Sequence, residues 1–250
     1  RPLLARRPLL LAGLAMVGGR AAWAEQEAAP PQTVAVYGDS MAQGVGHMLD
    51  QSLQRDRRFR VVNRGKPATA LGQPGNHNWI EAVRASVRQD RPGYSVMMFG
   101  GNDRLAMRRG GNTPHIPFRS EAWVELYRER LDAMLAPLAE AQVRIVWVGY
   151  PIAREPRYSG DMAFLNDIYR QAMQARGQVF IDTWTMFADE QGRFVPERRT
   201  PQGRVTRLRT EDGIHLTAAG YDMVAQRVKT TIEEMHAART PAPVAAPAEG

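Results

Sequence analysis

The regular alternation of short apolar segments with longer amphipathic ones limits this chain to a small set of folds. The short segments have the length and β-favouring composition of buried strands, whereas the longer ones repeat their apolar residues close to the helical period. Predicted strands cover residues 33–37, 59–63, 94–99, 143–148 and 179–182. Predicted helices cover residues 41–53, 79–89, 120–141, 161–176 and 217–238.

Apolar strands that alternate with helices imply right-handed crossovers and a parallel sheet covered on both faces. Five such strands predict a three-layer, flavodoxin-like α/β fold with the strand order 2-1-3-4-5. The segments 104–118 and 183–211 are predicted to be irregular, the second with a short hairpin around Gly192. No repeat or internal linker interrupts residues 33–239, which are therefore predicted to form one domain.

The N-terminal residues have the layout of a secretory signal peptide. Arg6 and Arg7 precede the apolar run 8–17, and Ala22-Trp23-Ala24 forms an A-x-A cleavage pattern. The apolar run is shorter than the roughly 20 residues that a membrane-spanning helix needs. Residues 1–24 are therefore expected to direct export to the periplasm or beyond. The paired arginines fit a twin-arginine signal, and they equally fit the basic start of an ordinary one.

The segments at the two borders of the predicted domain carry little that a core can bury. Residues 25–32 read as a short Ala/Pro linker, and the Pro/Ala-rich residues 240–250 read as a disordered tail. The net charge of the chain is +7, and four of these charges are arginines of residues 1–24, which contain no acid. The remaining +3 is too small to indicate nucleic-acid binding.

Three further sequence features exclude classes of site. The chain has no cysteine, which rules out disulfides, a cysteine nucleophile and thiolate metal sites. The histidines outside the C-terminal motif show no metal-ligand spacing, so no metal and no cofactor is predicted. No G-x-S-x-G sequence is present, which excludes the nucleophile elbow of α/β-hydrolases.

Polar clusters follow three of the predicted strands. Gly38-Asp39-Ser40 follows the first strand, residues 100–103 (Gly-Gly-Asn-Asp) follow the third, and residues 212–215 (Asp-Gly-Ile-His) come after the fifth. The carboxyl ends of parallel strands meet at one edge of the sheet, where open α/β folds bind their ligands. The topology therefore predicts that these clusters lie together.

The clusters supply the groups that nucleophilic catalysis needs. The Ser40 hydroxyl needs a base to take its proton, which His215 can do, and Asp212 can orient the imidazole from three residues earlier. Asn102 can donate its side-chain amide to an oxyanion, together with the Ser40 N–H. Each residue also has a plainer interpretation: Ser40 and Asp212 as helix N-caps, His215 as a hydrogen-bonded core histidine, and Asn102 as a turn residue.

The order and spacing of the three clusters resemble those of the SGNH (GDSL) hydrolase family. The resemblance covers roughly residues 33–237, and it is closest to a periplasmic branch of the family. It implies that Ser40 is the nucleophile, His215 the base and Asp212 its orienting acid, with the Ser40 N–H and Asn102 as oxyanion donors. Further matches are Leu165-Asn166, Ile181-Asp182-Thr183-Trp184 and the run from Arg207 to His215.

The chain departs from this family at its second sequence block, where a glycine N–H is the third oxyanion donor. Here Gly65 is the nearest glycine, but Thr69-Ala70 better matches the Ser/Thr-Gly pair of that block. A backbone donor needs no glycine where the local dihedral angles suit alanine. Ala70 is therefore the favoured third donor and Gly65 the alternative.

These residues predict an exported serine esterase that acts through an acyl-enzyme. The resemblance implies a small-molecule or glycan acyl ester as substrate, and a short acyl group, acetyl above all, on a cell-envelope glycan. Two alternatives stay open at this stage. One is an acyltransferase with the same triad, and the other is a non-catalytic glycan-binding protein on a degenerate SGNH scaffold. No nucleic acid is expected as a partner, and no membrane span once the signal is removed.

Overall fold

A computed structural model describes residues 30–75, 77–199 and 203–239. Over these residues the main sheet is parallel and has the order β2-β1-β3-β4-β5, as the sequence predicts. The predicted signal peptide (1–24), most of the linker and the tail (240–250) lie outside the described residues. The strands are β1 (Gln32–Gly38), β2 (Phe59–Asn63), β3 (Tyr94–Met98), β4 (Arg144–Val148) and β5 (Val179–Ile181).

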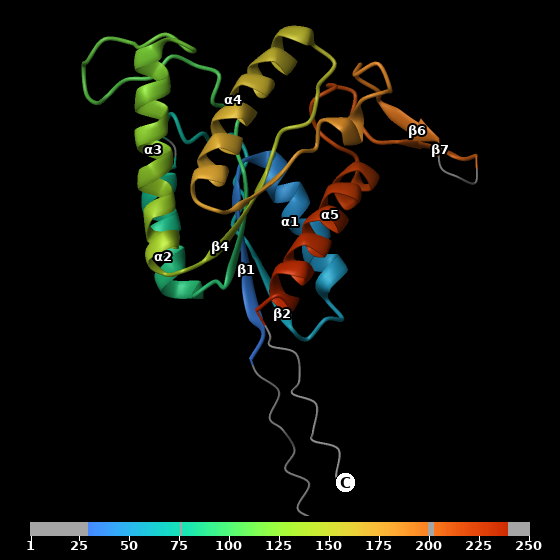
Figure 1. Cartoon of the computed structure of the whole chain (residues 1–250). Helices are drawn as coiled ribbons and strands as arrows, with labels where there is room; N and C mark the ends of the chain where they lie inside the picture. Colours follow the sequence, from blue (N-terminus) through green and yellow to red (C-terminus); the bar gives the residue numbers. More distant parts are fainter. Residues whose placement is uncertain (1–29, 76, 200–202, 240–250) are drawn as a thin grey trace, which may run out of the picture.

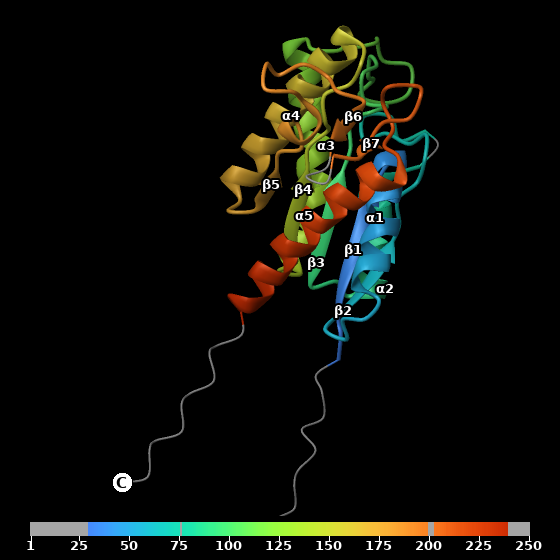
Figure 2. The same cartoon turned by 90° about the vertical axis from the view of Figure 1, so that its right-hand side faces the viewer.

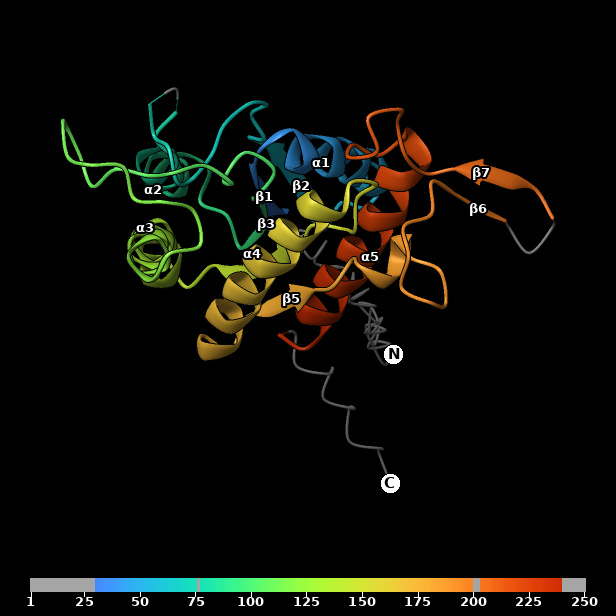
Figure 3. The ribbon, with the colours of Figure 1, turned by 90° about the horizontal axis from the view of Figure 1, so that it is seen from above.

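Five α-helices of the described chain connect and cover these strands, which gives the three layers of the flavodoxin-like α/β fold. Helices α1 and α5 pack together on one face, whereas α2, α3 and α4 cover the other (Figures 1 and 3). None of the described helices is long and apolar enough to cross a membrane. The helices are α1 (Ser40–Leu53), α2 (Trp79–Asp90), α3 (Glu121–Glu140), α4 (Pro156–Ala175) and α5 (Ala218–Ala237).

The central strands are apolar because both of their faces are covered. Every residue of β3 is buried, as are all residues of β1 after Gln32. Side chains from both faces complete the core, including Trp147 of β4, which stacks on Tyr169 of α4 at a ring-centroid distance of 4.3 Å. Strand β2 lies at the edge and is only partly buried. The near-continuous apolar runs in the sequence are thus those of a sheet buried on both sides.

Helix α4 begins earlier than the predicted range 161–176. Its N-cap is Glu155, whose carboxylate accepts the N–H groups of Arg157 (2.8 Å) and Tyr158 (2.5 Å). Pro156 occupies the first helical position, where its missing N–H costs nothing and its fixed φ is already helical. Pro156 and Arg157 are exposed and the buried Ser159 is polar, so apolar periodicity does not reveal this turn, whereas the Glu-Pro pair does.

The segment between β5 and α5 contains more regular structure than expected. The predicted turn at Gly192 is present, because Ala188 and Phe194 form an antiparallel bridge around it and Gly192 has a φ of 75°. A short 3₁₀ helix, Thr185–Phe187, precedes the turn. A second hairpin of β6 (Glu197–Arg199) and β7 (Val205–Arg207) was not predicted, and it projects from the body beside α5 (Figure 3).

The fold places the ends of the described chain far from the polar clusters. Strand β1 begins and α5 ends at the lower edge of the sheet, while α1 begins at the upper edge, where the strands end (Figures 1 and 2). The polar clusters therefore occupy the carboxyl edge, as the topology requires.

Candidate active site

Gly38 allows the first strand to pass close to its neighbour before the chain turns into α1. Its φ is 139°, and a Cβ atom there would lie 1.9 Å from the carbonyl oxygen of Met98 on β3. Any other residue would push the two strand ends apart. The close contact brings the end of β1 directly beside the end of β3, the two segments that continue into Ser40 and Asn102.

Asp39 is the N-cap of α1, so the interpretation of Ser40 as the cap is wrong. The Asp39 carboxylate accepts the N–H of Met41 at 3.0 Å and the hydroxyl of Tyr150 at 2.5 Å, and its side chain is completely buried. It also accepts a backbone hydrogen bond from Gly101, the neighbour of Asn102. A single carboxylate thus holds the segments of Ser40 and Asn102 together.

Ser40, His215 and Asp212 form a continuous hydrogen-bonded relay. Ser40 Oγ lies 2.8 Å from His215 Nε2, and His215 Nδ1 lies 2.6 Å from Asp212 Oδ2. Ser40 occupies the first position of α1, where backbone N–H groups have no helical partner. Two segments 175 residues apart in the chain therefore meet in the geometry that activates a serine hydroxyl.

The Asp212 carboxylate is held by the loop that carries His215. Asp212 Oδ1 accepts the N–H groups of Ile214 (2.8 Å) and His215 (3.0 Å) and the hydroxyl of Thr210 (2.6 Å). Partial burial acts to raise the pKa of Asp212, but the hydrogen bonds from His215 and Thr210 hold it well below its usual range. Asp212 does not cap α5, because Thr217 fills that role. The carboxylate is ionised and aimed at the imidazole.

Arg209 anchors the loop of Asp212 and His215 from the protein interior. Its fully buried guanidinium donates to the carbonyl oxygen of Ile214, at 2.6 Å, and to that of Ile152. It also lies over the rings of Phe187 and Phe194, 4.7 and 5.4 Å from their centroids. Burial lowers the pKa of Arg209 to about 10, so the group stays charged at neutral pH and favours the ionised form of nearby Asp212.

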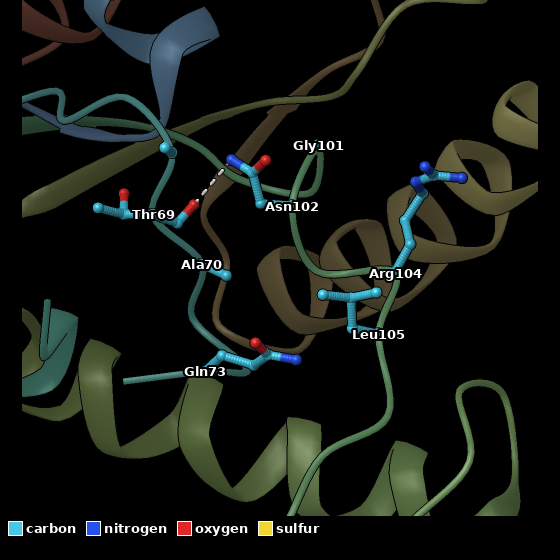
Figure 4. A pocket seen from close by; sticks show the side chains of 8 residues that line it. Thr69, Ala70, Gln73, Gly101, Asn102, Arg104 and Leu105 are labelled. Carbon is cyan, nitrogen blue, oxygen red and sulfur yellow. Dashed lines mark hydrogen bonds between the residues drawn. The ribbon is translucent and has the colours of Figure 1, made fainter. Parts of the chain in front are cut away.

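Asn102 lies at the end of β3 and contacts the loop that follows β2. Its Nδ2 donates to the carbonyl oxygen of Thr69 at 3.0 Å (Figure 4). An amide nitrogen has a second hydrogen, which remains a possible donor to an oxyanion. Asn102 and Ala70 line the same cavity of about 300 Å³, so the structure brings these two predicted donors to one site.

The two proposed third donors differ in what their N–H groups do. The Gly65 N–H donates to Asn63 Oδ1 at 3.1 Å, whereas no such bond of the Ala70 N–H is found within the described chain. Ala70 itself does not need a left-handed conformation. Ala68, with a φ of 56°, is the residue of this loop that adopts the strained left-handed conformation. The geometry favours Ala70 over Gly65 without testing either as a donor.

A second cavity adjoins Ser40. It has a volume of about 660 Å³ and is lined by Ser40, His215 and the exposed face of α1 and α5. Its floor is formed in part by Gly44, where a Cβ atom would lie 2.4 Å from the ring of Tyr221. Ser40 and His215 therefore open to this cavity, whereas Asn102 and Ala70 line the other one.

A family model described as a protein of unknown function (DUF459) matches residues 33–231, most of the 250-residue chain. The chain belongs to the DUF459 family. A comparison with curated proteins finds no match.

Solved structures of GDSL-type hydrolases share the fold of this DUF459 chain. One is a GDSL-like lipase from Bacteroides thetaiotaomicron, 16% identical, with a TM-score of 0.58 over 82% of this chain and 89% of that one. An acetylxylan esterase from Geobacillus stearothermophilus is 16% identical, with a TM-score of 0.54 over 81% and 94%. A psychrotrophic esterase from Pseudoalteromonas sp., inhibited by monoethylphosphonate, is 14% identical, with a TM-score of 0.54 over 82% and 98%. The resemblance inferred from the sequence is confirmed for the fold.

Several residues that shape the site of this DUF459 protein were not predicted from the sequence. Tyr150 is buried and bonds Asp39, and Trp79 is buried with its Nε1 donating to Thr69 Oγ1 at 3.0 Å. Arg209 and Thr210 hold the loop of Asp212 and His215, and the family match of residues 207–215 did not assign them this role. The Asp39 cap had a signal in the sequence, because aspartate directly before a helix is a favoured cap.

Two buried carboxyl groups near the site are expected to make the protein less stable as the pH rises toward neutral. Burial raises the pKa of Asp39 to about 6 and that of Asp103, which accepts the Gly72 N–H at 2.6 Å, to about 7. In the unfolded chain an aspartate has a pKa near 3.9. Each unit of difference between the folded and unfolded pKa changes the free energy of unfolding by about 1.4 kcal/mol. Between these values the native state binds more protons, so the free energy of unfolding falls as pH rises from about 4 to about 7.

Urea unfolding at a series of pH values measures this dependence. Asp103→Asn removes one of the two carboxyls and is expected to flatten the slope, while Asp50→Asn, an exposed position on α1, leaves it unchanged. A stability that rises steadily from pH 4 to 7, or an Asp103→Asn slope equal to that of the parent, contradicts the assignment.

Proposed function

We propose that this DUF459 protein is an exported serine esterase that hydrolyses short acyl esters through an acyl-enzyme on Ser40. The observation that carries the proposal is the relay of 2.8 Å from Ser40 to His215 and 2.6 Å from His215 to Asp212. A binding protein needs no nucleophile paired with an oriented base. The relay therefore argues against the non-catalytic alternative.

The relay defines the path of the Ser40 hydroxyl proton during the proposed reaction. With Asp212 ionised, the Nδ1–H of His215 donates to the carboxylate, and the Nε2 lone pair faces the Ser40 hydroxyl. His215 takes that proton as Ser40 Oγ attacks the ester carbonyl, and it returns the proton to the leaving alcohol. The Ser40 N–H and the free Asn102 N–H are the proposed donors to the oxyanion, with the Ala70 N–H as the third. A water activated by His215 then hydrolyses the acyl-enzyme.

Solvent access favours hydrolysis over acyl transfer. The His215 and Asp212 side chains are 40% and 45% exposed, so water reaches the base directly. A transferase has to keep water from the acyl-enzyme until its acceptor binds, and the cavity beside Ser40 is open. We therefore propose water as the acceptor.

The cavity beside Asn102 supports a short acyl group. Its volume is about 300 Å³, and its lining includes the small residues Ala68, Ala70 and Gly101. An acetylxylan esterase is among the structures with this fold, which agrees with an acetyl ester on a glycan as the proposed substrate. The proposed location is the periplasm or the exterior, because the first 24 residues have the pattern of a secretory signal.

Hydrolysis of 4-nitrophenyl acetate, butyrate and octanoate by the purified protein tests this proposal. We expect kcat/KM to fall about ten-fold or more from acetate to octanoate, a difference of about 1.4 kcal/mol or more in transition-state stabilisation. A fluorophosphonate should also label Ser40, as peptide mass mapping would show. Activity that increases with chain length contradicts the short-acyl substrate, and a protein that is neither active nor labelled contradicts the esterase.

A further inference from the structure

We infer that a cavity beside the proposed active site is an anion-binding subsite for a carboxylate or phosphate group of the substrate. The cavity has a volume of about 650 Å³ and lies where the β3–α3 segment meets the start of α4. Its lining residues are Arg104, Phe118, Arg119, Arg157, Gly160 and Asp161.

Positive charge exceeds negative charge in this cavity. Three arginines line it, and Asp161 is the single acid among its described lining residues. Arg104 contacts Asp161 Oδ2 at 3.1 Å, and Arg119 contacts Oδ1 at 3.0 Å. The Asp161 side chain is only 12% exposed, against 33% for Arg104 and 44% for Arg119. The carboxylate is thus covered while both guanidinium groups still face solvent.

Aromatic rings and backbone hold the first two arginines in place. Arg104 lies 4.3 Å from the ring centroid of Tyr158, and Arg119 lies 5.1 Å from that of Phe164. Arg119 also donates to the carbonyl oxygen of Gly160, and its own φ is 69°, a left-handed conformation that arginine rarely adopts. Both guanidinium groups are therefore fixed before a ligand arrives, which lowers the entropy cost of binding one.

The guanidinium N–H groups that have no protein partner among the described residues can donate hydrogen bonds to an oxyanion. A guanidinium carries five N–H groups in a planar fork, and the bonds to Asp161 and Gly160 use only part of them. Arg157, in the first turn of α4, makes no ion pair within the described chain and adds a further fork. Carboxylate and phosphate groups are the ligands whose geometry this fork fits.

Arg104 connects this cavity to the proposed active site. It lines the anion cavity and also the cavity that contains Asn102 and Ala70. In Figure 4 its side chain extends away from the loop of Thr69 and Ala70 and toward the outside of that cavity. One substrate molecule can thus place its ester at Ser40 and its anionic group among the arginines. This step rests on the proposed function, whereas the anion site itself does not.

The plainer alternative is an ion-pair network that only fastens the β3–α3 segment to α4. That role needs Arg104, Arg119 and Asp161, but it does not need Arg157. Substitution of Arg157 therefore separates the two interpretations. Arg157→Gln removes one charge at an exposed position, and Arg88→Gln, on the exposed surface of α2, is the matched control.

Anion binding is measured in a Ser40→Ala background, where no hydrolysis occurs. Calorimetric titrations with inorganic phosphate and with succinate test the two oxyanion classes separately. We expect one of them to bind at one site per chain, and Arg157→Gln to weaken it about ten-fold, as expected for loss of a charged hydrogen bond. Arg88→Gln should bind as the parent does. Absence of binding by both anions, or equal binding in the two variants, overturns the subsite.

A kinetic comparison tests the link to the ester. 4-Acetoxyphenylacetic acid and its primary amide carry the same acetyl ester and differ in the free carboxylate, which the para-substituted ring keeps from attacking that ester, and we expect a higher kcat/KM for the charged form. The ratio of the two values should fall toward one in Arg157→Gln and stay unchanged in Arg88→Gln. Hydrolysis without anion binding refutes the subsite alone, and anion binding without hydrolysis refutes the esterase alone.

Discussion

Ser40→Ala is expected to lower kcat for ester hydrolysis by at least about 10⁴-fold, the scale on which loss of a triad nucleophile acts. The reason is chemical, because no other hydroxyl is bonded to His215 in the described site. The substitution should leave folding unaffected. Ser40 is a helical residue, its neighbour Asp39 provides the cap, and alanine has the higher helix propensity.

The matched control for this substitution lies in the same helix. Ser52, at the other end of α1, bonds only the carbonyl oxygen of Leu49, so Ser52→Ala makes the same chemical change away from the site. We expect its kcat to equal that of the parent. Thermal unfolding of both variants shows whether the fold is kept. If Ser40→Ala retains activity within about ten-fold of the parent, Ser40 is not the nucleophile.

The sequence predicted the sheet because each strand carries its own signal. Strands β1, β3 and β4 are apolar on both faces, and a run of this kind between amphipathic helices has few alternatives. The same topology placed Ser40, Asn102 and His215 at one edge before any side-chain distance was known. The contact between Ser40 and His215 then follows from chain order and strand direction. The distance of 2.8 Å between Ser40 Oγ and His215 Nε2 cannot be derived from the sequence.

The supporting residues could not be predicted, because their roles depend on tertiary contacts. Arg209 looks like an ordinary surface arginine in a polar run, yet it is completely buried and bonds two carbonyl oxygens. Tyr150 follows β4, but its hydroxyl reaches Asp39, 111 residues away. The β6–β7 hairpin is too exposed to leave an apolar pattern, and the first turn of α4 has a single buried apolar side chain, that of Tyr158. Local signals were thus sufficient for the five strands of the main sheet and for the existence of the five helices, and tertiary packing determined the supporting contacts.

Ala70 stays the proposed third oxyanion donor, and the geometry of its loop is compatible with that role. At this position the backbone does not need glycine, because the left-handed residue of the loop is Ala68, with a φ of 56°. Thr69 anchors the loop through its bonds with Asn102 and with Trp79. The loop is therefore held beside Asn102 by contacts that a sequence motif does not encode.

Asp212→Asn is expected to lower kcat by about 10³- to 10⁴-fold, because the carboxylate selects the histidine tautomer. Asparagine can keep the three bonds that Asp212 Oδ1 accepts, so the loop should hold its shape. Its amide, however, replaces the Oδ2 that faces His215 Nδ1 at 2.6 Å. The amide donates to Nδ1, which places the imidazole proton on Nε2. His215 then presents a proton to Ser40 instead of a lone pair.

Asp222→Asn is the control for this change, because Asp222 on α5 is outside the lining of the cavity beside Ser40 and, within the described chain, accepts only from Gln226 at 3.1 Å. Its kcat should match that of the parent. The rate of fluorophosphonate labelling at Ser40 gives a second readout, since it depends on the same base and should fall in parallel with kcat in Asp212→Asn. If both rates stay within about ten-fold of the parent, Asp212 serves the loop alone, and His215 acts on Ser40 without an orienting acid.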